Sequence, residues 1–142
     1  MRNNKRVKLG NIYEIPLPNG FNAYGRLYED STLGIYKEQC KDISQLSLDG
    51  DYAFFVAVYL HTMRDGEWKV AGYKPFAEGE DEWPPTRFIK TAIEGHYSLY
   101  IKGEIIPATK EECKGLEAAA VWDRNHVVDR LMGDDKWNMI CE

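Results

Sequence analysis

The stretch of residues 9–30 constrains the fold more than any other part of the sequence, because it has the pattern of a complete β-hairpin. Its turn is Pro18-Asn19-Gly20, in which proline presets the backbone angle φ and glycine supplies a positive φ. A two-residue Asn-Gly loop would pair Pro18 with Phe21 and would require a backbone N–H that proline lacks. The sequence therefore predicts a three-residue loop that pairs Leu17 with Phe21.

This register divides the side chains of the hairpin between two faces, with Ile15 opposite Ala23 and Tyr13 opposite Gly25. The first face is uniformly apolar and comprises Tyr13, Ile15, Leu17, Phe21, Ala23, Gly25 and Leu27. The second face is mixed and comprises Ile12, Glu14, Pro16, Asn22, Tyr24, Arg26 and Tyr28. We expect Glu14 and Arg26 to attract one another on the mixed face. Alternation that agrees on both strands from one turn is typical of a hairpin.

More strands are expected after the hairpin. In residues 52–61, YAFFVAVYLH, both alternate faces are apolar, which is typical of a central strand covered on both sides. Asp65-Gly66 turns the chain into residues 68–73, which we expect to be the antiparallel partner of that strand. Shorter strands are predicted at residues 33–36, 87–91, 96–101 and 104–107, and a weak one around Leu46 and Leu48.

Short helices are expected near the C-terminus. Thr109-Lys110-Glu111-Glu112 has the pattern of a capping box, and Asp123 can cap a second helix that runs to Met132. The length of 142 residues suits a single domain, residues 1–142. Strands followed by helices predict an α+β fold: a curved, mostly antiparallel sheet with the short C-terminal helices packed on one face.

Composition narrows the class of function. A net charge of −5 lacks the basic footprint of a nucleic-acid binder. The longest apolar run, about ten residues, is too short to span a membrane, and no apolar segment follows the basic N-terminal residues as a secretory signal would require. The three cysteines, Cys40, Cys113 and Cys141, are odd in number and widely spaced. We therefore expect a cytoplasmic protein with reduced thiols.

Motifs for catalysis, metal binding and cofactor binding are not apparent in the sequence. The three histidines have no metal-ligand spacing, and neither a nucleophile elbow nor a phosphate-binding loop occurs. The sequence therefore predicts no catalytic residue, no metal and no cofactor. Two alternatives remain. One is a small cytosolic hydrolase with paired carboxylates from Glu14, Asp49 and Asp51. The other is a peptide-binding or small-ligand-binding module with an aromatic groove formed by Tyr24, Tyr28, Trp68 or Trp83.

The acidic run before Trp83 suggests an interface. Four carboxylates, those of Glu78, Glu80, Asp81 and Glu82, repel one another there without benefit to folding. Charges beside an aromatic anchor are typical of binding surfaces. The alternative is a solvated loop in which Trp83 packs against the core.

Several blocks follow one another along the sequence: GNIYEIPL at 10–17, Asn19-Gly20, YGRL at 24–27, WKVAGYKP at 68–75, PTRF at 85–88, Gly115-Leu116-Glu117 and Trp122. In this order they resemble the immunity protein 26 family, a family of bacterial immunity proteins of polymorphic-toxin systems. The sequence departs from the family pattern at Asn11, where aspartate is usual, and at Ala71, where a larger aliphatic residue is common.

The resemblance implies a non-enzymatic protein that binds a cognate toxin domain in the cytoplasm. Such toxins are often nucleases, and an acidic inhibitor would be steered to their basic substrate groove. We therefore predict a toxin-binding surface made of Glu78, Glu80, Asp81, Glu82 and Trp83, with Glu29 and Asp30 as a second patch.

Overall fold

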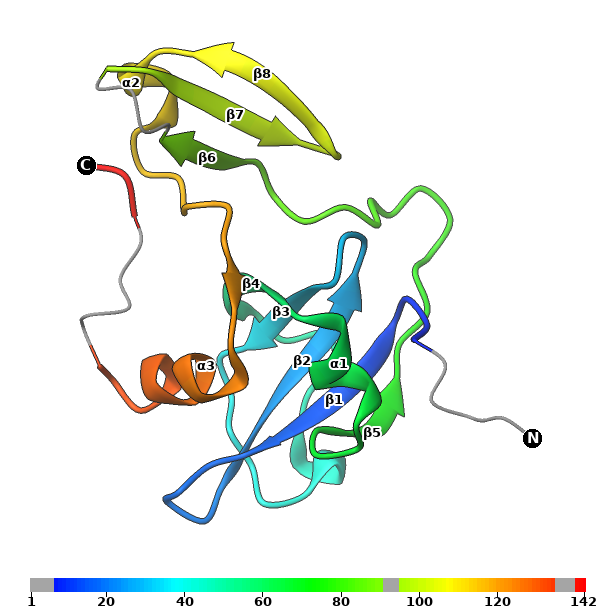
Figure 1. The fold of residues 1–142 in the computed structure, drawn as a ribbon. Coiled ribbons are helices and arrows are strands. Elements are labelled where there is room, and N and C mark those ends of the chain that lie inside the picture. Colours follow the sequence, from blue (N-terminus) through cyan, green and yellow to red (C-terminus); the bar gives the residue numbers. More distant parts are fainter. Residues whose placement is uncertain (1–6, 91–94, 135–139) are drawn as a thin grey trace.

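The computed structural model describes residues 7–90, 95–134 and 140–142 (Figure 1). The basic N-terminal residues 1–6 and the last residue of the strand expected at 87–91 lie outside these ranges. The described residues form two β-sheets and three short helices. The expected α+β class with mostly antiparallel strands is confirmed.

The larger sheet has six strands in the order β5-β1-β2-β3-β4-β9. Neighbouring strands are antiparallel except β4 and β9, which are parallel. The strands are β1 (Asn11–Pro16), β2 (Asn22–Tyr28), β3 (Thr32–Tyr36), β4 (Tyr52–Val58), β5 (Lys69–Tyr73) and β9 (Val121–Trp122). Helices α1 (Leu60–Arg64) and α3 (Arg124–Leu131) belong to this part of the molecule (Figure 1).

The smaller sheet has three antiparallel strands, β6 (Arg87–Lys90), β7 (Tyr97–Ile101) and β8 (Glu104–Ala108). Helix α2 (Lys110–Cys113) contacts β7. The chain reaches this sheet through the long segment after β5 and returns through residues 115–120 to β9 (Figure 1). Phe88 of β6 forms a parallel bridge with Ala118, so the returning segment touches both sheets.

The predicted register of the N-terminal hairpin is confirmed. Ile15 lies opposite Ala23, and the backbone N–H of Leu17 donates to the carbonyl of Phe21 at 3.0 Å. Gly20 has a φ of +88°, as the turn requires. Phe21, which the register assigns to the apolar face, lies outside the main core, and its side chain is 40% exposed at the tip of the hairpin.

Both faces of the larger sheet are buried. The apolar face of the hairpin forms the main core with β3, β4, α1 and α3, and Val127 of α3 is fully buried there. The mixed face of the hairpin is covered as well, because Ile12 and Tyr24 pack with Tyr36, Cys40 and Leu46 in a second core. The segment that covers this face holds a 3₁₀-helix, Ile43–Gln45, capped by Asp42, and the weak strand expected around Leu46 and Leu48 is not formed.

Three expectations about the apolar run at 52–61 are wrong. The strand ends at Val58, and helix α1 begins at Leu60. The helix is stabilised by Met63, which packs into the main core. The chain thereby crosses to the far edge of the sheet, where β5 pairs with β1 instead of β4. The strand is also not central, since only the two-residue strand β9 lies beyond it.

The helix starts near the C-terminus follow the sequence. Thr109 and Glu112 form the expected capping box of α2, with each side chain accepting from the other's backbone N–H. Asp123 caps α3 by accepting from the N–H of Asn125 at 2.9 Å.

Candidate functional site

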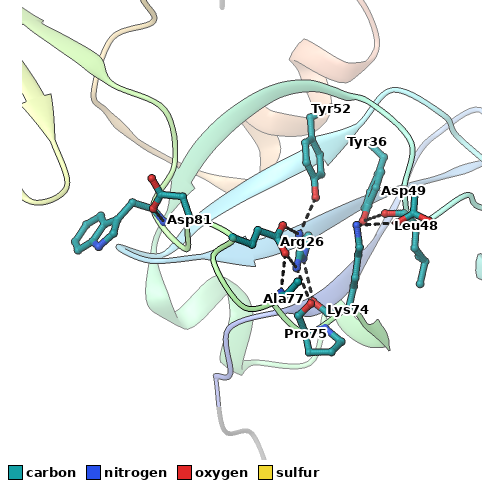
Figure 2. A network of polar contacts seen from close by, with 11 residues as sticks. Arg26, Tyr36, Leu48, Asp49, Tyr52, Lys74, Pro75, Ala77 and Asp81 are labelled. Atoms are coloured by element: carbon teal, nitrogen blue, oxygen red, sulfur yellow. Dashed lines mark hydrogen bonds and ion pairs between the residues drawn. The ribbon is translucent and has the colours of Figure 1, made fainter.

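Arg26 of β2 lies at the centre of a buried polar network (Figure 2). Its side chain is only 1% exposed. Its Nε donates to the carbonyl of Lys74 and its Nη2 to the carbonyl of Pro75, both at 3.0 Å. Its Nη1 donates to Glu80 Oε2 at 2.7 Å. The guanidinium therefore holds the segment after β5 against β2.

Glu80 completes this contact from the segment's side. Its Oε1 accepts from the backbone N–H of Ala77 at 2.9 Å. The hydrogen bond from Arg26, followed by that from Ala77, lowers the pKa of Glu80 to about 2. Glu80 is therefore ionised throughout the neutral range, and its charge is opposed by Arg26.

Aromatic rings enclose the guanidinium. The ring centroid of Phe76 lies 3.9 Å from Arg26 Cζ, a cation–π distance, and Tyr28 packs edge-on against Phe76, Phe55 and Tyr52. Burial by itself lowers the pKa of Arg26, but the hydrogen bonds with Glu80 and Tyr52 outweigh it and raise that pKa. A buried cation with this many partners serves the fold.

The expected attraction between Glu14 and Arg26 is wrong. Arg26 pairs with Glu80, which approaches from the segment after β5. Glu14 instead accepts from the hydroxyl of Tyr24 at 3.2 Å and lies 3.5 Å from Lys69 Nζ. Burial and the Glu14 carboxylate raise the pKa of Tyr24 to about 12.

The acidic run is less self-repelling than the sequence suggests. Besides the Glu80 contact, Asp81 lies 3.1 Å from Lys102 Nζ and accepts from the N–H of Trp83 at 2.9 Å. The Trp83 amide and Lys102 together lower the pKa of Asp81. The side chains of Glu78 and Glu82 are exposed and form no ion pair within the described residues.

The two predicted patches meet in space. The backbone N–H of Glu29 donates to the carbonyl of Glu82 at 2.9 Å. Trp83 is half-buried, with its indole ring close to Gly103 of the β7–β8 turn. We call the combined surface the acidic surface, and it comprises Glu29, Asp30, Glu78, Glu80, Asp81, Glu82 and Trp83.

Asp30 links the acidic surface to the smaller sheet. Its carboxylate accepts from the hydroxyl of Tyr100 on β7 and lies 3.7 Å from Arg87 Nη2 on β6. The bond to Asp30 and then burial raise the pKa of Tyr100. Arg87 and Tyr100 were not predicted as site residues. The only local signal is an arginine at the start of an apolar strand, which is too weak to identify a buried cation.

Most of the side chains proposed for the two alternative functions have other partners or are buried. Of the hydrolase carboxylates, Glu14 is held by Tyr24 and Lys69, and Asp49 lies 3.0 Å from Lys74 Nζ. Three of the four residues proposed for an aromatic groove, Tyr24, Tyr28 and Trp68, are buried. In the part of the chain that the structure describes, no cluster of three or more His, Cys, Asp or Glu side chains is arranged to hold a metal ion.

The fold and this geometry define a small α+β protein whose buried polar centre serves the fold and whose surface presents a group of carboxylates. The sequence model of the family described as Immunity protein 26 matches residues 8–99, about two-thirds of the chain. The chain therefore belongs to the immunity protein 26 family, and the suspected resemblance is confirmed.

Two further comparisons gave no match, neither to a curated protein nor to a solved structure. Within residues 7–90, 95–134 and 140–142, no helix has the length and apolar character needed to cross a membrane.

Proposed function

We propose that this immunity protein neutralises a cognate bacterial toxin by binding the toxin domain directly in the cytoplasm, without catalysis. Membership of the immunity protein 26 family is the observation that carries this proposal. The geometry supports it, because the polar network around Arg26 holds the fold, while Asp30, Glu78, Asp81 and Glu82 of the acidic surface are exposed.

The charge of the acidic surface favours a basic partner. A nuclease toxin has a basic groove for its nucleic-acid substrate, and opposite charge accelerates the encounter of two proteins. A stable complex of this kind buries roughly 1,600 Å² in total and depends on a few well-packed anchors. We therefore propose that a nuclease domain is the partner and that the acidic surface contacts its basic groove.

Members of the acidic surface have different roles in this proposal. Glu80 positions the segment through Arg26, so its substitution would test the fold as well as the binding. Glu78 and Glu82 are exposed, and their substitution tests binding alone. Trp83 supplies the aromatic member of the contact.

Co-expression with the toxin encoded beside this gene tests the proposal. We expect the toxin domain to co-purify with the protein and the growth of the host to be restored. A matched control is a toxin domain of unrelated sequence, which we expect neither to co-purify nor to be neutralised. If the neighbouring toxin neither co-purifies nor loses its toxicity, the proposed function is wrong.

A further inference from the structure

Among the residues that the structure describes, two arginines, Arg26 and Arg87, are buried, and their surroundings differ. Arg26 has hydrogen bonds from its Nε and from both terminal nitrogens. Arg87 is 4% exposed, yet its Nε has no hydrogen-bond partner within the described residues. Its ion pair with Asp30, at 3.7 Å, is longer than a hydrogen bond. Burial accordingly lowers the pKa of Arg87, whereas that of Arg26 is raised.

Arg87 lines a cleft between the two sheets. The cleft has a volume of about 300 Å³. It is lined by Arg87, Ile89, Tyr100 and Ile105 from the smaller sheet, by Asp30, Ala57 and Val121 from the side of the larger sheet, and by residues 119 and 120 of the returning segment. Ile105 is 63% exposed and Val121 is 53% exposed. Among the described residues these are the two most exposed large apolar side chains, and both line this cleft.

An under-satisfied buried cation beside exposed apolar side chains is the composition of an interface anchor. Buried polar groups normally have partners in the folded protein, but Arg87 has an unpartnered Nε and only a long ion pair with Asp30. The guanidinium lines the cleft, so a carboxylate from outside would pair with it from that side. Interfaces combine an apolar pocket with a polar rim, and a charge that becomes desolvated there must be paired.

We propose that the cleft between the sheets is an anchor site for the toxin domain, taking an aliphatic side chain with an adjacent carboxylate that pairs with Arg87. This inference rests on the proposed function and adds to it the chemistry of one toxin segment. Asp30 belongs to both the cleft and the acidic surface, so the two form one continuous contact region. The acidic surface steers the encounter, and the cleft holds the partner once it has arrived.

Two valines of similar exposure allow a matched test of the apolar part. Val121 lines the cleft, whereas Val70 of β5 is 51% exposed at the opposite edge of the larger sheet. We expect Val121→Asp to weaken binding of the neighbouring toxin domain by about tenfold or more in titration calorimetry, and Ile105→Asp to do the same. Val70→Asp introduces the same charge and should leave the affinity unchanged. Equal affinities for Val121→Asp and Val70→Asp would overturn the inference.

Arg87→Lys and Arg87→Gln test the carboxylate. Lysine keeps the positive charge, so we expect Arg87→Lys to retain more affinity than Arg87→Gln at equal thermal stability. Equal losses would show that no carboxylate is bound. If the Arg87 variants do not fold, Ile105→Asp still tests whether the partner occupies the cleft, because the side chain of Ile105 is exposed.

The wild type separates this inference from the proposed function. If the wild type binds the toxin domain and the cleft variants bind equally well, only the inference about the cleft is wrong. If the wild type does not bind, both the inference and the proposed function are wrong. Sedimentation of the wild type is the second control. Self-association that Val121→Asp abolishes would assign the cleft to a second copy of this chain and contradict the inference.

Discussion

Arg26 and Glu80 show how one residue pair organises a segment that lacks regular secondary structure. The two are 54 positions apart, and the pair fixes the chain between β5 and β6 to the centre of the larger sheet. Arg26 could be read from the sequence as a member of the mixed hairpin face. Its partner could not, because nothing local distinguishes Glu80 from the carboxylates on either side of it.

Removal of the Glu80 charge should therefore cost stability. In Glu80→Gln the buried guanidinium of Arg26 loses its counter-ion, and we expect the free energy of unfolding to fall by about 2 kcal/mol. Glu78→Gln removes the same charge two positions away, where the side chain is exposed, and should change it by no more than about 0.5 kcal/mol. Urea unfolding of both variants measures the difference, and equal stabilities would mean that the ion pair contributes nothing.

The same pair predicts a pH dependence. The folded-state pKa of Glu80, about 2, is lower than its ordinary value of 4.5. The stabilisation is therefore complete above about pH 5 and is lost as the pH falls toward 2. We expect the stability gap between wild type and Glu80→Gln to narrow over this window in urea unfolding at successive pH values. A gap that stays constant from pH 7 to pH 2 would contradict the assignment.

At the scale of elements, the hairpin register and the helix caps could be predicted from local sequence patterns. Strand pairings between segments distant in the sequence could not. The hairpin register follows from one turn, and the helix caps at Thr109 and Asp123 follow from side chains within three residues. The partner of β5 could not be predicted, because it depends on α1 carrying the chain across the sheet. The division into two sheets depends on the same kind of distant contact.

The acidic surface was partly accessible from the sequence. Charge density marked residues 78–83, and charge at the far end of the hairpin marked Glu29 and Asp30. Their proximity arises from the Glu29–Glu82 backbone contact, which joins segments about fifty positions apart and leaves no local trace. Arg87, Ile105 and Val121 come from three separate strands, so their cleft emerges only from the packing of the two sheets.

Gly34 of strand β3 lies against the aromatic rings packed around Arg26, among them Tyr28, Tyr52 and Phe55, which we call the aromatic shell. A Cβ atom on Gly34 would lie 2.9 Å from Phe55 Cε2 and 3.1 Å from Tyr28 Cε1. We expect Gly34→Ala to lower the free energy of unfolding by about 2 kcal/mol, because buried rings must shift. Gly20→Ala is the control. A Cβ there meets no atom within 4 Å, and only its positive φ opposes the change, at about 1 kcal/mol. A smaller loss for Gly34→Ala than for Gly20→Ala would be inconsistent with tight packing of the shell.

The whole molecule combines a packed interior, organised around the Arg26 network, with a charged exterior. The Arg26 network and the two cores hold the larger sheet, and Asp30 connects it to the smaller sheet through Tyr100. The net charge is −5, and the segment before β6 carries several of the exposed carboxylates that contribute to it. This arrangement suits an inhibitor that acts by binding a basic protein.

The most direct test of toxin binding through the acidic surface is the association rate with the neighbouring toxin domain, measured by stopped flow at several ionic strengths. We expect the wild-type rate constant to fall as salt rises, and Glu78→Lys/Glu82→Lys to bind about tenfold more slowly at low salt with a weaker salt dependence. Glu38→Lys/Glu111→Lys changes the charge equally at exposed positions outside the acidic surface and serves as the control. Identical rates and salt dependence for the two double variants would contradict the account.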